Sequence, residues 1–321
     1  MENVTMSEKF DWGEHKLDGD VVKLAGWGLH QNLDDAQKYC EKIAKSHYEN
    51  FIITNHFTPI EVRQHIQNVY AFCRYGDDLG DDAPFPPEQR RRLLQAWLED
   101  LRIAHEGNWS GQPQHPILIA LAHTSKKYNI PIEPYEKLIT AFMWDQERLQ
   151  YSTWDELQEY CINSADPVGH LFLYVYGHDE EELRTISDAT CTALQLANHW
   201  QDIRRDLAQG RRYLPLETME MHNYTLEDYN NMVYDERWIS ILKHEVDRAQ
   251  NLFDKGKALW GKVDPHLAVD LEMFTLGGEE ILKSIRKQKY NTWSKRPKVS
   301  KFRQARLLFY AKRKWKKISK K

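Results

Sequence analysis

The sequence has few cysteines, little glycine and proline, and no long apolar run. Its four cysteines form no CxxC pair, so neither a disulfide framework nor a zinc site is expected. Only 15 Gly and 12 Pro occur in 321 residues, which disfavours a loop-dominated chain. No stretch approaches the roughly 20 apolar residues of a membrane span, and residues 1–20 do not resemble a signal peptide. We therefore expect a folded cytoplasmic protein that is neither secreted nor membrane-spanning.

Two kinds of catalytic motif are also missing. No glycine-rich dinucleotide loop is present, because Gly277 and Gly278 lie inside a helical pattern with no strand before them. NADPH is therefore not predicted as a cofactor. No Ser-His-Asp or Cys-His arrangement is legible, so hydrolysis through a covalent intermediate is not suggested.

Acidic residues are missing from one region of a chain whose net charge is only −4. Residues 283–321 carry 17 Lys or Arg and no Asp or Glu. This basic tail suits a helix lying on anionic lipid, which predicts peripheral contact with the inner face of the membrane. A solvated terminus and nucleic-acid binding are the alternatives, and nucleic acid fits the rest of the sequence poorly. The apolar residues at near-helical spacing in this tail are Phe302, Ala305, Leu308 and Phe309.

Helical periodicity runs through nearly the whole chain, and no convincing alternating strand is found. This predicts an all-α protein. Apolar residues at 41% and aromatic residues at 12% supply one large core, so we expect a single domain over 1–321 that ends in the basic tail. The predicted helices cover 33–49, 59–82, 88–105, 115–128, 134–150, 154–176, 180–208, 225–260 and 265–289.

The first of two acidic motifs, YAFCRYGDDLGDD, covers residues 70–82. Asp77 and Asp81 are four residues apart, which places both carboxylates on one face of a helix. Arg74 and Tyr70 lie about one and two turns earlier, respectively, on approximately the same face. The motif therefore combines a phenol, a guanidinium and a group of carboxylates.

The second motif is part of the segment QLANHWQDIRRD. Asn198, Asp202 and Asp206 repeat every four residues, so three oxygen ligands line one helical stripe. Clustered carboxylates repel one another and need solvent, cations or a metal nearby. Ordinary solvated faces are the alternative, but the aromatic and apolar residues around both motifs argue against it.

Magnesium is the metal that this chemistry favours. It prefers hard oxygen ligands and takes one or two carboxylates together with water and substrate phosphates. Two facing stripes are expected to hold a diphosphate through two or three Mg²⁺ ions. Spacing alone leaves open whether the ligands of the first motif are Asp77 and Asp81 or their neighbours Asp78 and Asp82.

Both motifs resemble the signature segments of squalene and phytoene synthases. The similarity extends to HYENF at 47–51, RLQYSTWDE at 148–156, YCINSADPVG at 160–169 and KRPKVS at 295–300, and it covers about residues 35 to 310. The resemblance implies the class I isoprenoid (terpenoid) synthase fold, with helices around a central cavity and diphosphate release assisted by Mg²⁺.

Residue roles follow from the resemblance, position by position. The implied metal ligands are Asp77, Asp81, Asp202 and Asp206. The implied catalytic residues are Tyr70, Arg74, Tyr160 and Asn198. The implied substrate contacts are His47, Phe51, Gln195, Trp200, Arg205, Tyr213 and Arg296. Arg205, Arg211 and Arg212 either neutralise phosphate or pair with neighbouring acids, and the role of Tyr213 is open.

Three departures from the family pattern narrow the expected reaction. Tyr48-Glu49-Asn50 replaces a segment that usually contains lysine, and Gln201 stands where the family often carries arginine. Gly277-Gly278 stands about where relatives place a tyrosine, which is expected to enlarge or reshape the cavity wall. Fewer cations suit an enzyme that holds one diphosphate rather than two.

These variants are similar to the hydroxysqualene synthase (HpnC-type) branch of bacterial hopanoid biosynthesis. The branch implies Mg²⁺-dependent conversion of presqualene diphosphate and water to hydroxysqualene and diphosphate, with the substrate supplied by a sister synthase. Asn198, and less strongly His199 and Gln201, are candidates for orienting the water. One alternative is a condensing synthase that makes presqualene diphosphate, dehydrosqualene or phytoene from two prenyl diphosphates. The other is a non-catalytic scaffold or assembly-factor relative.

Overall fold

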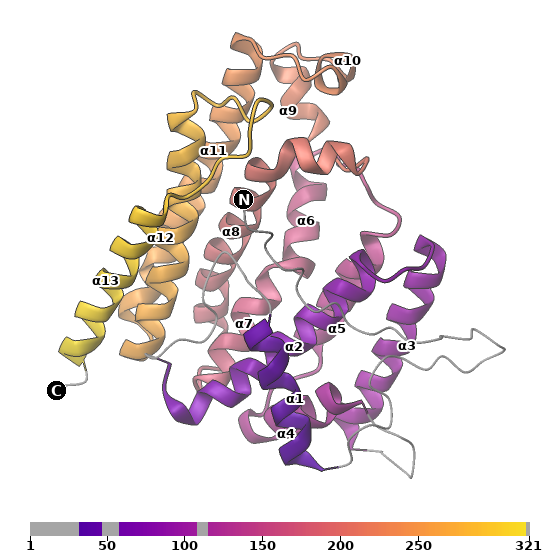
Figure 1. Cartoon of the computed structure of the whole chain (residues 1–321), viewed down its shortest axis with the longest axis vertical. Coiled ribbons are helices and arrows are strands. Elements are labelled where there is room, and N and C mark those ends of the chain that lie inside the picture. Colours follow the sequence, from indigo (N-terminus) through magenta and orange to yellow (C-terminus); the bar gives the residue numbers. More distant parts are fainter. Residues whose placement is uncertain (1–31, 47–57, 108–114, 319–321) are drawn as a thin grey trace, which may run out of the picture. The chain divides into compact units, whose positions relative to one another are not determined.

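The computed structural model describes residues 32–46, 58–107 and 115–318 (Figure 1). Across these ranges the secondary structure is helical, apart from one isolated bridge between Gln150 and Arg212. The all-α prediction is confirmed. The chain divides into two compact units, one formed by the described residues up to Glu147 with Tyr174–Gly177, and the other by Arg148–Leu173 with the described residues from His178 onward. The single-domain assignment stays a prediction.

The first unit is built around α2. Its side chains Phe72 and Tyr75 are fully buried, and the Tyr75 ring centroid lies 4.7 Å from that of Trp97 on α3. Helix α1 packs against α2 and α4, and α2 also packs against α3, α4 and α5. The helices of this unit are α1 (Leu33–Ser46), α2 (Ile60–Asp81), α3 (Pro87–Glu106), α4 (Pro116–Tyr128) and α5 (Glu133–Trp144).

The two glycines of the first acidic motif let α5 approach α2 closely. A Cβ atom at Gly76 would lie 2.8 Å from Cε2 of Phe142, and one at Gly80 would lie 3.3 Å from Nε2 of Gln146. Because glycine has no Cβ, α5 packs directly on the α2 backbone at these positions. This contact supports the helical turn that carries the acidic residues.

The second unit is built around α8, which packs against α6, α11 and α12. Trp200 of α8 and Trp238 of α11 are both fully buried. The helices of this unit, which includes α7 up to Leu173, are α6 (Trp154–Ser164), α7 (Asp166–Val175), α8 (Glu181–Ala208), α9 (Leu216–Met221), α10 (Leu226–Asn230), α11 (Glu236–Gly256), the 3₁₀ helix η1 (Lys257–Gly261), α12 (Pro265–Lys287) and α13 (Lys301–Ile318).

Two predicted long helices are interrupted in this unit. The predicted helix 154–176 divides at Ala165, because Pro167 lacks an N–H and favours the first turn of a new helix. The predicted helix 225–260 contains α10, a turn, α11 and η1. Asp235 starts α11 as an N-cap, accepting hydrogen bonds from the backbone N–H groups of Arg237 and Trp238. The short helix α9 was missed.

Gly278 of α12 borders closely packed side chains and no open space, so the expected enlargement of a cavity is not found at this position. A Cβ atom there would overlap the ring of Phe253 on α11 and would lie 3.0 Å from Cδ2 of Leu194 on α8. The volume that a tyrosine would need is therefore filled by Phe253. Gly278 allows three helices to pack closely.

The basic tail docks on α12 through ion pairs. Arg303 of α13 lies 2.9 Å from Glu280, and Lys314 pairs with Glu272. Both glutamates are 3% exposed, so these pairs hold the inner side of α13 against the unit. Where it is described, the tail is a packed helix rather than a solvated terminus. No helix in the described ranges is long and apolar enough to cross a membrane.

Candidate active site

The first acidic stripe lies at the C-terminal end of α2. The Arg74 guanidinium lies 3.4 Å from an Asp77 carboxylate oxygen and also hydrogen-bonds Asp78. Asp78 is 5% exposed, whereas the Asp77 side chain is 45% exposed and Asp81 is exposed. At about 100° per residue, Asp77, Asp81 and Arg74 share one face with Tyr70. This geometry favours the Asp77 and Asp81 pair as the outward ligands.

The helix dipole disfavours carboxylates at this position. The last turn of α2 contains no basic residue, and its C-terminal carbonyls carry partial negative charge. Arg90 of α3 offsets part of this charge, because its Nη1 donates to the carbonyl oxygens of Gly80 at 2.8 Å and Asp81 at 3.1 Å. Carboxylates at the C-terminal end of a helix lower its stability, so their presence here is better explained by a role in binding than by a role in folding.

The second acidic stripe, Asn198, Asp202 and Asp206, lies toward the C-terminal end of α8. Oδ1 of Asn198 is buried and accepts no hydrogen bond from any residue that the structure describes. A buried amide oxygen without a donor is costly, and a cation or a bound water would satisfy it. Gln195 lies one turn earlier and is half-buried.

Arg296, from the loop after α12, pairs with Asp202. Its Nε donates to Asp202 Oδ1 at 2.5 Å, and its Nη2 donates to Oδ2 at 2.8 Å. The same Nη2 lies 2.9 Å from Oε1 of Gln201, whose Nε2 donates to the carbonyl oxygen of Pro297 at 2.7 Å. The pair with Asp202 raises the pKa of Arg296 above its usual value. A cation therefore does stand beside Gln201, although the linear sequence suggested that one had been lost.

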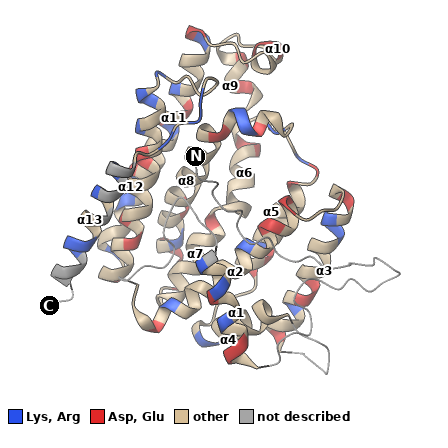
Figure 2. Ribbon diagram, viewed as in Figure 1, with Lys and Arg blue, Asp and Glu red and all other residues tan. Residues whose placement is uncertain are grey.

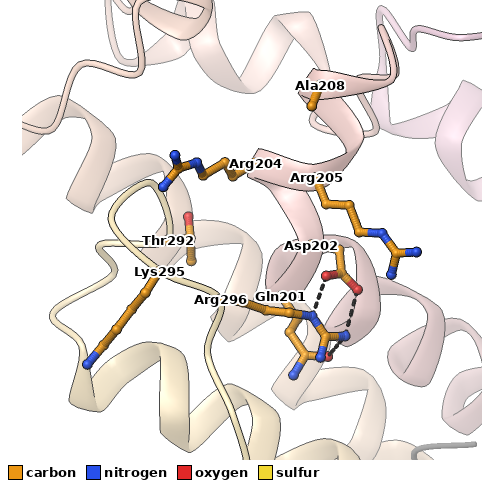
Figure 3. A pocket seen from close by; sticks show the side chains of 8 residues that line it. All are labelled: Gln201, Asp202, Arg204, Arg205, Ala208, Thr292, Lys295 and Arg296. Carbon is orange, nitrogen blue, oxygen red and sulfur yellow. Dashed lines mark hydrogen bonds and ion pairs between the residues drawn. The ribbon is translucent and has the colours of Figure 1, made fainter. Parts of the chain in front are cut away.

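A basic cavity of about 320 Å³ adjoins this ion pair (Figure 3). Four cationic residues and one carboxylate line it, and Arg296 already pairs with that carboxylate. The cavity therefore presents an excess of positive charge, which suits a phosphate-bearing ligand. Its lining residues are Gln201, Asp202, Arg204, Arg205, Ala208, Thr292, Lys295 and Arg296.

Aromatic rings cluster beside the second stripe. The imidazole of His199 stacks on Tyr213 with ring centroids 3.7 Å apart, and the Tyr213 centroid lies 5.8 Å from Tyr160 and 5.7 Å from Tyr151. Tyr160 is 4% exposed. Ring faces of this kind stabilise a nearby cation by about 0.5–2 kcal/mol each. The structure thus gives Tyr213 a place beside His199, whereas the sequence left its role open.

His199 is held in its neutral form. Burial, with a smaller effect of the Arg211 guanidinium, lowers the pKa of the imidazole to about 3. Its Nε2 is buried and forms no hydrogen bond within the described part of the chain. A neutral imidazole of this kind orients a water molecule by hydrogen bonding but does not retain a proton at pH 7.

Several predicted site residues lie elsewhere. His47 and Phe51 fall outside the described residues. Trp200 is fully buried on the side of α8 opposite Asn198, two residues and about 200° away, so it packs in the core of the second unit. Arg205 is exposed and lines the cavity.

Sequence reasoning left Arg212 between two roles and missed Tyr151. Arg212 is buried, and its Nη1 donates to the carbonyl oxygens of Tyr151 at 2.9 Å and Leu214 at 2.5 Å. It holds the chain after α8 instead of facing a phosphate. Tyr151 is fully buried in the ring cluster, and its place in the similar segment RLQYSTWDE was the available signal.

The donor set of both stripes fits Mg²⁺. Carboxylate and amide oxygens are hard ligands, and the buried Asn198 oxygen lacks a donor among the described residues. Within the described ranges no group of three or more His, Cys, Asp or Glu forms a preformed cage. Carboxylate pairs that leave coordination positions to water and phosphate suit this ion better than a closed protein cage.

Comparisons with known proteins agree with this geometry. The family model described as squalene/phytoene synthase matches residues 44–303. A 15-cis-phytoene synthase from Synechocystis sp. is 31% identical over 235 residues, which are 70% of this chain and 68% of the relative. The crystal structure of squalene synthase HpnC from Alicyclobacillus acidocaldarius is 44% identical, covers 81% of this chain and 96% of that chain, and superposes with a TM-score of 0.75.

A second solved structure supports the fold alone. A dehydrosqualene synthase in complex with ligand is 24% identical and superposes with a TM-score of 0.78 over 89% of this chain and 98% of that chain. The all-α isoprenoid synthase fold expected from the sequence is confirmed.

Proposed function

This chain belongs to the squalene/phytoene synthase family, and from that premise we propose that it converts presqualene diphosphate and water to hydroxysqualene and diphosphate. The observation that carries the proposal is the stripe on α8. The stripe carries the Asn198 amide oxygen, which has no hydrogen-bond donor among the described residues, and the carboxylates of Asp202 and Asp206. The neutral His199, which follows Asn198 in the chain, lies in the aromatic cluster. The 44% identity to the HpnC structure supports the choice of this branch.

The acidic residues and the arginine have separate tasks in the proposed mechanism. Asp77, Asp81, Asp202 and Asp206 would hold Mg²⁺, which would neutralise the charge that develops on the leaving diphosphate. Arg74 contributes a fixed positive charge beside the first pair. When the C–O bond breaks, its electron pair leaves with the diphosphate, and a cyclopropylcarbinyl cation remains on the substrate.

The aromatic cluster acts on that cation. The ring faces of Tyr160 and Tyr213 stabilise it during rearrangement. Asn198 and neutral His199 orient one water, whose oxygen forms the new C–O bond and then loses a proton to the released diphosphate or to solvent. Because the pKa of His199 is lowered to about 3, this residue orients the water without keeping the proton. No hydride donor takes part, so NADPH is not required.

The test is product analysis by mass spectrometry. Purified protein, Mg²⁺ and presqualene diphosphate are incubated without NADPH in H₂¹⁸O. We expect hydroxysqualene carrying one ¹⁸O atom, and no product after chelation of the metal or with Asp202→Ala. Unlabelled alcohol, or turnover that is independent of metal, would contradict the proposed water capture.

A condensing synthase is the second candidate, and one observation favours it. Arg296 restores a cation beside Gln201, so the charge deficit that argued against two diphosphates is smaller than the sequence suggested. Condensed product from farnesyl diphosphate in the same assay would move the assignment to this class. Failure to convert either substrate, with or without metal, would favour the scaffold alternative.

We also propose that the outer face of α13 contacts an anionic membrane surface. Phe309 is 61% exposed, Lys312 and Arg313 are also exposed, and Arg313 lies 5.9 Å from the Phe309 ring centre. The helix carries no acidic residue, as Figure 2 shows where its side chains are described. Basic and aromatic side chains on one helix face suit anionic headgroups above an apolar layer.

Vesicle flotation tests this contact. We expect the protein to bind phosphatidylcholine vesicles that contain about 30% phosphatidylglycerol, and to bind pure phosphatidylcholine weakly. Lys312→Glu with Arg313→Glu should lower binding at least ~10-fold, at about 1 kcal/mol per basic residue near the surface. Lys126→Glu with Lys255→Glu changes the same charge on exposed positions elsewhere and should have little effect. Equal loss in both double variants would show attraction by net charge alone.

A further inference from the structure

Gln201 uses both ends of its side-chain amide, although it occupies a position where arginine is common in similar sequences. Oε1 accepts from Nη2 of Arg296 at 2.9 Å, and Nε2 donates to the carbonyl oxygen of Pro297 at 2.7 Å. The side chain is 4% exposed, so these bonds form away from water. A buried amide with both ends satisfied restricts the groups that it contacts.

Arg296 is thereby held in one orientation. Its Nε and Nη2 form a two-point pair with Asp202, and Nη2 is shared with Gln201. Nη1 has no acceptor among the residues whose placement is described, and Arg296 lines the basic cavity (Figure 3). Two-point pairing fixes the plane of the guanidinium, so the remaining N–H groups have a defined direction.

The loop that carries Arg296 is also fixed on either side. Nε1 of Trp238 donates to the carbonyl oxygen of Tyr290 at 3.1 Å, and Oγ of Ser284 donates to that of Lys298 at 3.1 Å. Gln201 contacts the segment between these points. Its loss should therefore release Arg296 and Pro297 locally and leave the rest of the loop in place.

We propose that Gln201 is a positioning residue that holds Arg296 against Asp202, so that the loop after α12 supplies the cation of the second acidic motif. An arginine at position 201 would provide this charge from α8 itself. In this protein, Gln201 instead binds an arginine that lies 95 residues later in the chain. The role of that cation in binding diphosphate rests on the proposed function.

The competing explanation is that Gln201 only fills space in the second unit. The two explanations differ in what happens when Arg296 is absent. If Gln201 acts through Arg296, then Gln201→Leu should have no further effect in an Arg296→Gln background. If it only packs, its effect should be the same in both backgrounds.

The experiment combines three measurements on the full chain. Calorimetry measures the binding of inorganic diphosphate with Mg²⁺, hydrogen exchange monitors residues 291–300, and steady-state kinetics separates KM from kcat. We expect Gln201→Leu to weaken diphosphate binding and to raise KM about 10-fold, the effect of losing one charge-assisted bond, with a smaller change in kcat. Exchange should quicken at the backbone amides of Arg296 and Lys298.

Two further variants sharpen the result. Gln201→Glu keeps the acceptor for Arg296 but loses the donor to Pro297, so it should keep Arg296 in place, while the added negative charge beside Asp202 should weaken diphosphate binding. Ser284→Ala loses a hydrogen bond to the same loop at Lys298 without touching Arg296, and should leave KM unchanged. Unchanged exchange in Gln201→Leu, or equal loss of affinity with and without Arg296, would overturn the proposal. Absence of turnover in the unmodified protein would reject the proposed function while the binding and exchange data still test Gln201.

Discussion

Asp81→Asn is expected to lower kcat by about 100- to 1000-fold, the usual cost of removing one group that stabilises charge in a transition state. Asparagine keeps the size of the side chain but removes the negative charge that would hold Mg²⁺. The free energy of unfolding should stay the same or rise by about 0.3–1 kcal/mol, because Asp81 is an exposed anion at the negative end of α2. Kinetics and thermal unfolding check both parts.

Asp82→Asn is the matched control for this prediction. Asp82 is also exposed and follows directly in the chain, but it lies about 100° further around the helix axis than Asp81. Its replacement should change kcat less than about 3-fold, which is below ~0.7 kcal/mol. Similar losses in both variants would contradict the assignment of Asp77 and Asp81 as the ligand pair. A large loss only in Asp82→Asn would move the ligands to the neighbouring pair.

Gly278→Tyr is expected to lower the free energy of unfolding by about 3 kcal/mol or more, because the added ring has no space in the second unit. Phe253 is fully buried against this position, and Leu194 closes another side. Chemical denaturation measures the change, and a soluble but unfolded product would be the extreme case.

A double-mutant cycle with Gly278→Ala keeps this prediction measurable if the tyrosine variant does not fold. A single methyl at Gly278 would overlap the Phe253 ring, so Gly278→Ala should destabilise by about 1–3 kcal/mol despite the better helix propensity of alanine. Phe253→Leu removes the overlapping ring atoms. The double variant should therefore be more stable than the sum of the single effects, and strict additivity would show that the contact is unimportant.

Local pattern predicted those parts of the candidate site that lie on one helix. Asn198, Asp202 and Asp206 recur every four residues, and a helix places such residues on one stripe whatever surrounds it. The same periodicity predicted α2 and its acidic face. Helix boundaries were less predictable where a proline or a cap intervened, as at Pro167 and Asp235.

Charge counting along the chain failed at Gln201. The sequence shows a glutamine in place of a common arginine, and from this we inferred a missing cation. Arg296 follows α11 and α12 in the sequence, yet the structure places its guanidinium against the carboxylate of Asp202, the residue next to Gln201. Linear proximity is a poor guide to charge because Coulomb interactions depend on distance in space.

By itself, the sequence determined the all-α class, the two acidic stripes, the family and the basic tail, because each depends on residue periodicity or on local composition. Only the tertiary structure decided that Asp78 faces Arg74 in the interior, that Phe253 fills the space at Gly278, that α13 docks through buried glutamates, and that Gln201 holds Arg296. Apart from the Arg74–Asp78 pair, whose partners both lie on α2, these features join residues from different parts of the chain. Their energies depend on burial and on contact distance, which no local pattern encodes.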